Sequence, residues 1–129
     1  MLKLNFETRN YEKFTMLHCK GRIVFRDEAT ALSSKVAELL AYSEAVVLDL
    51  SGVEMIDSAG LGELVVALMS GKITDRPVRL AAPNKFVRKL LELTNLTSVF
   101  EVYPTLQEAI LAHETPFSNT RRSLGAAAI

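Results

Sequence analysis

The chain has 129 residues, the length of one ordinary domain, and 49% of them are hydrophobic, enough to bury a core without disulfides or metals. Its 15 basic and 15 acidic residues cancel and form no basic run, which argues against a nucleic-acid-binding surface. The single cysteine, Cys19, excludes an internal disulfide. The N-terminal residues lack the apolar segment of a signal peptide, and the longest apolar run, residues 64–69, is far shorter than the roughly 20 residues that span a membrane. We therefore expect a cytoplasmic protein.

The first part of the chain predicts a β-hairpin. Residues 2–8 alternate apolar and polar side chains, as a half-buried strand does. After a polar turn, residues 14–20 read as a second strand, which Gly21 ends or bends.

The rest of the chain alternates between helical and strand patterns. Asp27 is a candidate helix N-cap, and the apolar residues after it recur with helical spacing as far as Leu40. Residues 45–50 form a short apolar run that suits a central strand covered on both faces, and residues 51–57 read as a loop. Helical patterns then begin near residues 57, 86 and 106, with strands expected at residues 77–81 and 99–103.

This order of elements predicts the fold class. Strands that alternate with helices are joined by right-handed crossovers and form a mostly parallel sheet, to which the hairpin adds an antiparallel strand. We therefore expect a single-domain α/β fold with a mixed, mostly parallel β-sheet, an N-terminal hairpin and about four helices. The domain is expected at residues 1–113. Residues 114–129 lack an amphipathic period and are expected to be a flexible C-terminal tail.

The segment from residue 45 to residue 62 carries the strongest functional signal. A buried strand ends there, a loop crosses the carboxyl edge of the sheet, and a helix begins at Asp57 and Ser58. In open α/β sheets, ligands and chemistry usually lie at this edge. The N–H groups and dipole of a helix N-terminus favour a phosphate on Ser58, whereas the charge of Asp57 would repel one. Phosphorylation would add about −1.5 to −2 charges, so the surface would change charge steeply.

Plainer interpretations of these residues stay open. Ser and Asp are among the commonest N-caps, and the spacing alone favours a cap over a phosphorylation site. Asp49 lies in an otherwise apolar strand and needs polar partners, so we expect it to support the loop beneath Ser58 rather than to act directly.

Catalysis finds little support in the sequence. No G-x-S-x-G elbow surrounds Ser58, and neither histidine, His18 or His113, lies near it in the sequence. His18 and Cys19 are neighbours on a predicted strand and should face opposite sides, so they cannot pair. No metal-ligand spacing is visible, and we expect neither a metal nor a cofactor.

At residues 47–62 the sequence resembles the STAS family, the anti-sigma factor antagonists of bacteria. The core of the resemblance is the Asp-Ser-x-Gly-Leu-Gly motif at residues 57–62, placed between a strand and a helix. The resemblance covers about residues 2–112. It includes the Gly-Arg-Ile turn at residues 21–23 and C-terminal segments at residues 87–96, 99–103 and 106–110.

The resemblance implies a phosphorylation switch at Ser58. In antagonists of this family, the serine of this motif is phosphorylated by an anti-sigma factor that is also a serine kinase. The unphosphorylated antagonist binds that kinase and frees the sigma factor, and a PP2C-type phosphatase restores the serine. The resemblance thus implies these two partners. The charge balance and the short apolar runs of the sequence predict no direct contact with nucleic acid and no membrane insertion. The expected partner-binding residues are Asp27, Met55, Ile56, Asp57, Ser58, Ala59 and Gly60.

One departure from the family and two alternatives qualify this hypothesis. Family members often carry an acidic residue soon after the turn, where this chain has Val24 and Phe25, so we expect a more apolar binding edge.

The first alternative is a non-phosphorylated STAS interaction module of a signalling assembly or a lipid-transport ATPase, which an exposed apolar patch near Met55 and Ile56 would favour. The second is a hydrolase or nucleotide-binding enzyme on a similar sheet.

Overall fold

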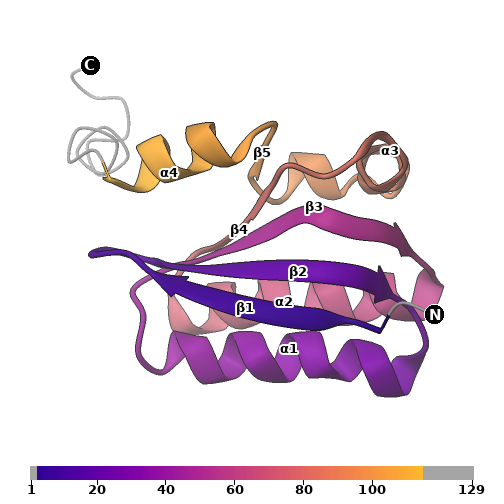
Figure 1. Cartoon of the computed structure of the whole chain (residues 1–129), viewed down its shortest axis with the longest axis horizontal. Coiled ribbons are helices and arrows are strands. Elements are labelled where there is room, and N and C mark those ends of the chain that lie inside the picture. Colours follow the sequence, from indigo (N-terminus) through magenta and orange to yellow (C-terminus); the bar gives the residue numbers. More distant parts are fainter. Residues whose placement is uncertain (1–2, 115–129) are drawn as a thin grey trace.

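The computed structural model describes residues 3–114, so the tail expected at residues 114–129 lies outside the described residues except for its first. In the described part, five strands form one sheet in the order β1-β2-β3-β4-β5, and helices connect them (Figure 1). The elements are β1 (Asn5–Asn10), β2 (Thr15–Ile23), α1 (Arg26–Leu40), β3 (Val46–Ile56), α2 (Ser58–Thr74), β4 (Val78–Ala81), α3 (Lys85–Leu93), the 3-10 helix η1 (Leu96–Ser98), β5 (Val102–Tyr103) and α4 (Leu106–Glu114).

The sheet has the predicted mixed topology. β1 and β2 pair antiparallel as a hairpin, and all other neighbouring strands pair parallel. In Figure 1, α1 and α2 lie together on one face of the sheet and α4 lies on the other. The α/β fold class is therefore confirmed. None of the helices within residues 3–114 combines the length and apolarity that a membrane span requires.

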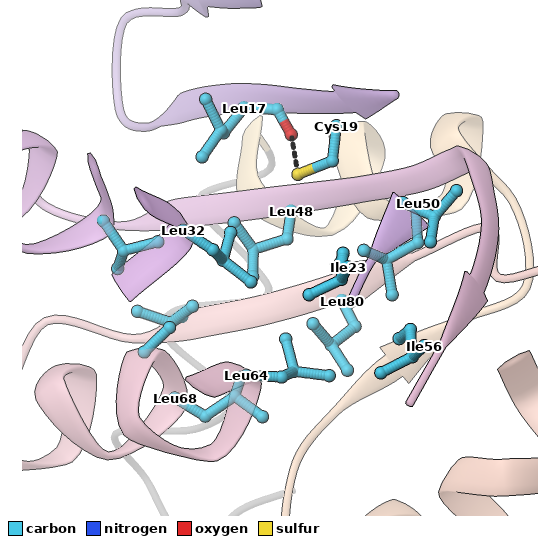
Figure 2. Close-up of a cluster of buried hydrophobic side chains, with 14 of the residues drawn as sticks. Leu17, Cys19, Ile23, Leu32, Leu48, Leu50, Ile56, Leu64, Leu68 and Leu80 are labelled. Atoms are coloured by element: carbon cyan, nitrogen blue, oxygen red, sulfur yellow. Dashed lines mark hydrogen bonds between the residues drawn. The ribbon is translucent and has the colours of Figure 1, made fainter. Parts of the chain in front are cut away.

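The larger core lies between the sheet and the helices α1, α2 and α3. Figure 2 shows leucine and isoleucine side chains from β2, β3 and β4 meeting those of α1 and α2 in one cluster. In β3, Leu48 and Leu50 belong to this cluster, whereas Val47 belongs to the smaller core on the opposite face. β3 is thus a central strand covered on both faces, as its apolar run predicts.

The predicted loop at residues 51–57 is wrong, because β3 continues to Ile56. Gly52 pairs with Lys20 and Ile56 pairs with Ile23, with two irregularities in the register between β2 and β3. The polar residues at this end of β3 resemble a loop in sequence. They are held extended by hydrogen bonding to a strand about thirty residues earlier, which local composition does not reveal.

The prediction that Asp27 caps the first long helix is also wrong. α1 begins at Arg26, and its N-cap is Phe25, which has φ 60° and ψ 139°. β2 continues past Gly21, which adopts φ +114°, as far as Ile23, so only a short turn is left before α1. Asp27 therefore lies within the first turn of α1, and its side chain lies outside the described residues.

The strand predicted at residues 99–103 is reduced to Val102–Tyr103. η1 precedes it, and the backbone N–H groups of Val99 and Phe100 both donate to the carbonyl of Leu96. Phe100 is buried in the larger core. The apolar residues that resemble the start of a strand therefore belong to a helical turn and a core contact.

The opposite face of the sheet is closed by α4. Arg79 on β4 is buried and donates from Nη1 to Nε2 of His113 at 2.8 Å. The Nδ1–H of the same imidazole donates to the carbonyl of Ala109 at 2.8 Å. Because arginine can only donate and a carbonyl can only accept, this arrangement selects the neutral imidazole with its proton on Nδ1. His113 is therefore a structural contact between α4 and the sheet.

Candidate functional site

Ser58 is the first residue of α2, and only Asp57 separates it from the carboxyl end of β3. Both Ser58 and Ala59 are exposed. The prediction that a helix begins at Asp57 and Ser58 is confirmed, and the N-cap residue is Asp57. Ser58 is thus exposed at the positive end of the α2 dipole.

The carboxylate of Asp57 binds two backbone N–H groups from different parts of the chain. Its Oδ1 accepts from Gly60 at 2.7 Å, and its Oδ2 accepts from Phe25 at 3.1 Å. These bonds lower the pKa of Asp57 from its ordinary value of 3.8, because they stabilise the charged form of the carboxyl group. The bond from Gly60 has the larger effect and that from Phe25 the smaller. The Asp57 side chain therefore caps α2 and also links the turn before α1 to the start of α2 by a hydrogen bond.

Gly60 allows the start of α2 to lie directly on the end of β2. It is buried, and a Cβ at this position would lie 1.7 Å from the carbonyl oxygen of Ile23. The backbone N–H of Asp57 donates to that same carbonyl at 3.3 Å. No larger residue fits at Gly60 unless α2 moves away from β2. This glycine therefore sets how closely the start of α2, which carries Ser58, packs on β2.

Phe25 places an aromatic side chain close to this site. The residue is 66% exposed, and its backbone N–H donates to the carboxylate of Asp57. Its positive φ is uncommon for a residue with a Cβ and stores backbone strain, which in folded proteins is often found near functional sites. Val24 beside it is half-buried, so Phe25 is the more exposed apolar side chain of the turn.

Asp49 finds its partners within the sheet. Its Oδ1 accepts the N–H of Ser51 at 2.9 Å, and its Oδ2 lies 2.5 Å from Nδ1 of His18, the residue it faces across the β2–β3 pair. These contacts stabilise the middle of β3 rather than the start of α2. The sequence indicated that Asp49 needs partners but held no sign that His18 is one of them, because the strand register alone brings the two together.

Cys19 lies on the opposite side of β2 from His18, as predicted. It is buried in the larger core, and burial, with a smaller effect of the Asp49 charge, raises the pKa of its thiol to about 12. A thiol in this state is not a nucleophile at neutral pH. Within residues 3–114 no group of His, Cys, Asp and Glu side chains is arranged to hold a metal ion.

The structure brings four of the seven expected partner-binding residues together at the start of α2. Of these, Asp57 is half-buried, Ser58 and Ala59 are exposed, and Gly60 is buried. Nearby on β3, Met55 is half-buried and Ile56 is only 3% exposed. These two residues therefore form no large exposed apolar patch of the kind that would favour the non-phosphorylated alternative.

Comparison with known proteins agrees with this architecture. The family model of the STAS domain matches residues 5–109 of the sequence, so the chain belongs to the STAS domain family. A protein of Thermotoga maritima, named provisionally as an anti-sigma factor antagonist, is 40% identical over 65 residues. That match covers 50% of this chain and 58% of the Thermotoga protein, so it spans less than two thirds of the relative.

Solved structures share the fold. An anti-sigma factor antagonist from Mycobacterium paratuberculosis superposes with a TM-score of 0.76 and 26% identity, covering 88% of this chain and 96% of that chain. The phosphorylated form of the Bacillus cell fate determinant SpoIIAA has a TM-score of 0.63 and 14% identity, covering 82% of this chain and 96% of that chain. At that identity the second likeness concerns the fold alone.

Proposed function

We propose that the chain is an anti-sigma factor antagonist whose binding to an anti-sigma factor is switched by phosphorylation of Ser58. The observation that carries the proposal is that Ser58 is exposed next to the fixed carboxylate of Asp57, at the first turn of α2. The names of the Thermotoga and Mycobacterium relatives support the class of function. The unphosphorylated chain is the form that binds the anti-sigma factor and releases the sigma factor.

The mechanism is a change of charge at a surface that the partner covers. Before phosphorylation, the negative charge of Asp57 is offset by two backbone N–H groups and the α2 dipole. A phosphate on Ser58 adds about −1.5 to −2 charges beside it. At an effective dielectric constant of about 20, two unit charges about 5 Å apart repel by roughly 3 kcal/mol. In the free chain, where water surrounds both charges, the same pair repels by only about 1 kcal/mol. Covering both charges with a partner therefore adds roughly 2 kcal/mol of repulsion and weakens binding by roughly thirtyfold without a change of fold.

The partners follow from this cycle. The anti-sigma factor is proposed to be the serine kinase that modifies Ser58, and a PP2C-type phosphatase is proposed to remove the phosphate. The chain itself then performs no catalysis, and the cycle runs in the cytoplasm, where sigma factors act. The domain that serves it is residues 1–113, with residues 114–129 as an appended tail.

The direct test is the intact mass of the chain purified from its own cells, followed by fragment mapping. We expect a fraction that carries one phosphate on Ser58 and loses it when treated with a PP2C-type phosphatase. A Ser58→Ala chain purified in the same way is the control and should carry none. If no growth condition yields phosphate on Ser58, the switch is wrong, and the non-phosphorylated interaction module of a signalling assembly or a lipid-transport ATPase becomes the better hypothesis.

A further inference from the structure

Helix α2 is apolar on the side that it turns to solvent as well as on the side that it turns to the sheet. Its buried residues are Gly60, Leu64, Ala67, Leu68 and Gly71. On the opposite side, Val66 is 50% exposed, Met69 is 40% exposed and Ile73 is 81% exposed. A helix that is apolar all round is normally buried on all sides, so the outer side of α2 lacks a covering element.

The exposed apolar residues form one line that starts at Ser58. Gly62, Val66, Met69 and Ile73 follow Ser58 at successive spacings of three or four residues, which places them on one face of a helix. We call these four residues the α2 stripe. At about 1.5 Å per residue, the line from Ser58 to Ile73 is about 22 Å long.

The α2 stripe carries no charge. The charged residues of α2 are Glu63 and Lys72, and both lie beside the stripe. Glu63 accepts a hydrogen bond from the Ser33 hydroxyl of α1 at 2.8 Å, and the Lys72 ammonium lies 5.4 Å from the ring centre of Phe100. At Gly62, a Cβ would have no atom within 4 Å, so the stripe is open between Ser58 and Val66.

We propose that the α2 stripe is a docking surface for the anti-sigma factor that acts on Ser58, and that the matching face of this partner is apolar and uncharged. The inference rests on the proposed function. A partner that reaches the Ser58 hydroxyl must lie over the first turn of α2, and the stripe continues from that turn without interruption. The partner therefore binds along the helix, and the stripe supplies affinity while Ser58 supplies the switch.

A second copy of the chain is a poorer occupant of this surface. In a two-fold contact along the whole of α2, the Ser58 end of each helix would lie against the helix of the other copy, whether the two helices run antiparallel or parallel. That arrangement would cover Ser58, which must stay accessible to a kinase and a phosphatase. An occupant that binds the stripe and modifies Ser58 in the same encounter meets both requirements.

Photo-crosslinking in the cells that produce the full chain identifies the occupant. A photoreactive amino acid replaces Met69, and the control replaces Leu111 of α4, which is 51% exposed on the other face of the sheet. We expect the adduct at position 69, but not the one at position 111, to contain an anti-sigma factor. An adduct between two copies of this chain, an adduct with another class of protein, or no adduct at position 69 would overturn the proposal.

Affinity measurements with the crosslinked anti-sigma factor then separate this inference from the proposed switch. Val66→Lys and Ile73→Lys should each weaken binding by about tenfold or more, because the interface would desolvate a charge, while Leu111→Lys should stay within about twofold. Circular dichroism and thermal unfolding confirm that each variant is folded. If the stripe variants bind like the natural chain while Ser58→Asp binds weakly, the stripe is wrong and the switch stands. If Ser58→Asp binds like the natural chain while the stripe variants bind weakly, the switch is wrong and the stripe stands.

Discussion

The carboxylate of Asp57 holds the backbone N–H of Phe25 at 3.1 Å, and this bond joins the turn before α1 to the start of α2. The other oxygen of the same carboxylate caps α2 through Gly60. One side chain thus fixes both segments that surround Ser58. A partner that recognises this surface depends on Asp57 for its shape as well as for its charge.

Replacing Asp57 should weaken the contact between the turn before α1 and the start of α2, and so lower the stability of the fold. In Asp57→Asn, the amide oxygen can still cap α2, but the amide NH₂ faces the N–H of Phe25 and cannot accept from it. We expect a loss of about 1 kcal/mol in the free energy of unfolding, measured with urea. Asp75→Asn is the control, because Asp75 is exposed in the left-handed conformation that Asn tolerates and should change stability little. Equal stability of Asp57→Asn and the natural chain would contradict the structural role.

Acid should remove the contribution of Asp57. Its pKa is lowered in the folded chain, so the charged form is the one that favours folding. This stability is fully present above the unfolded value of about 3.8 and is lost as the pH falls through the lower folded value. The difference in urea midpoint between the natural chain and Asp57→Asn should therefore shrink between about pH 5 and pH 2. A difference that stays constant over this range would show that the charge of Asp57 does not matter for folding.

Two glycines near the start of α2 should respond to alanine in opposite directions. Gly60→Ala would drive a methyl group into the carbonyl of Ile23 and should destabilise the fold by about 2 kcal/mol or more. Gly62→Ala meets no atom within 4 Å and should stabilise the helix by up to about 1 kcal/mol. Thermal unfolding of the two variants side by side measures both effects. Similar melting temperatures for the pair would refute the close contact between α2 and β2.

Substitutions at Ser58 test the switch itself. Because Asp57 provides the cap, Ser58→Ala should change the free energy of unfolding by less than about 0.5 kcal/mol and should bind the anti-sigma factor like the natural chain. Ser58→Asp should bind about tenfold or more weakly, because it adds a negative charge next to Asp57. Calorimetric titration compares the three chains. Equal affinity of the alanine and aspartate variants would argue against an electrostatic switch.

The Cys19 thiol should not react with thiol reagents while the chain is folded. The thiol is buried, and its pKa is raised to about 12, so almost no thiolate forms near pH 8. A thiol reagent should react with it only when urea unfolds the chain, and the reaction rate should follow the unfolded fraction. Rapid labelling of the folded chain would indicate that β2 opens locally.

Most of the architecture could be predicted from periodicity. The apolar spacing of each helix and the short apolar strands follow from local pattern, so the order of elements and the mixed sheet are both correct. The errors lie where long-range contacts override local composition. Residues 51–56 look like a loop but extend β3, because β2 provides hydrogen-bonding partners for them. Asp27 looks like a cap but lies inside α1, because β2 runs on to Ile23 and leaves Phe25 to turn the chain.

The sequence by itself determined that a serine follows an aspartate at the start of a helix, since the Asp-Ser-x-Gly-Leu-Gly motif directly follows a buried strand. Only the tertiary structure decided what surrounds that serine. The bond from Phe25 to Asp57 and the contact of Gly60 with Ile23 join β2 to the start of α2, which lies far from it in the sequence. The tertiary structure likewise decides which side of α2 is exposed, because the sheet covers only one of its faces. The sequence alone cannot distinguish an apolar residue that is buried from one that is exposed, since α2 is apolar on all sides.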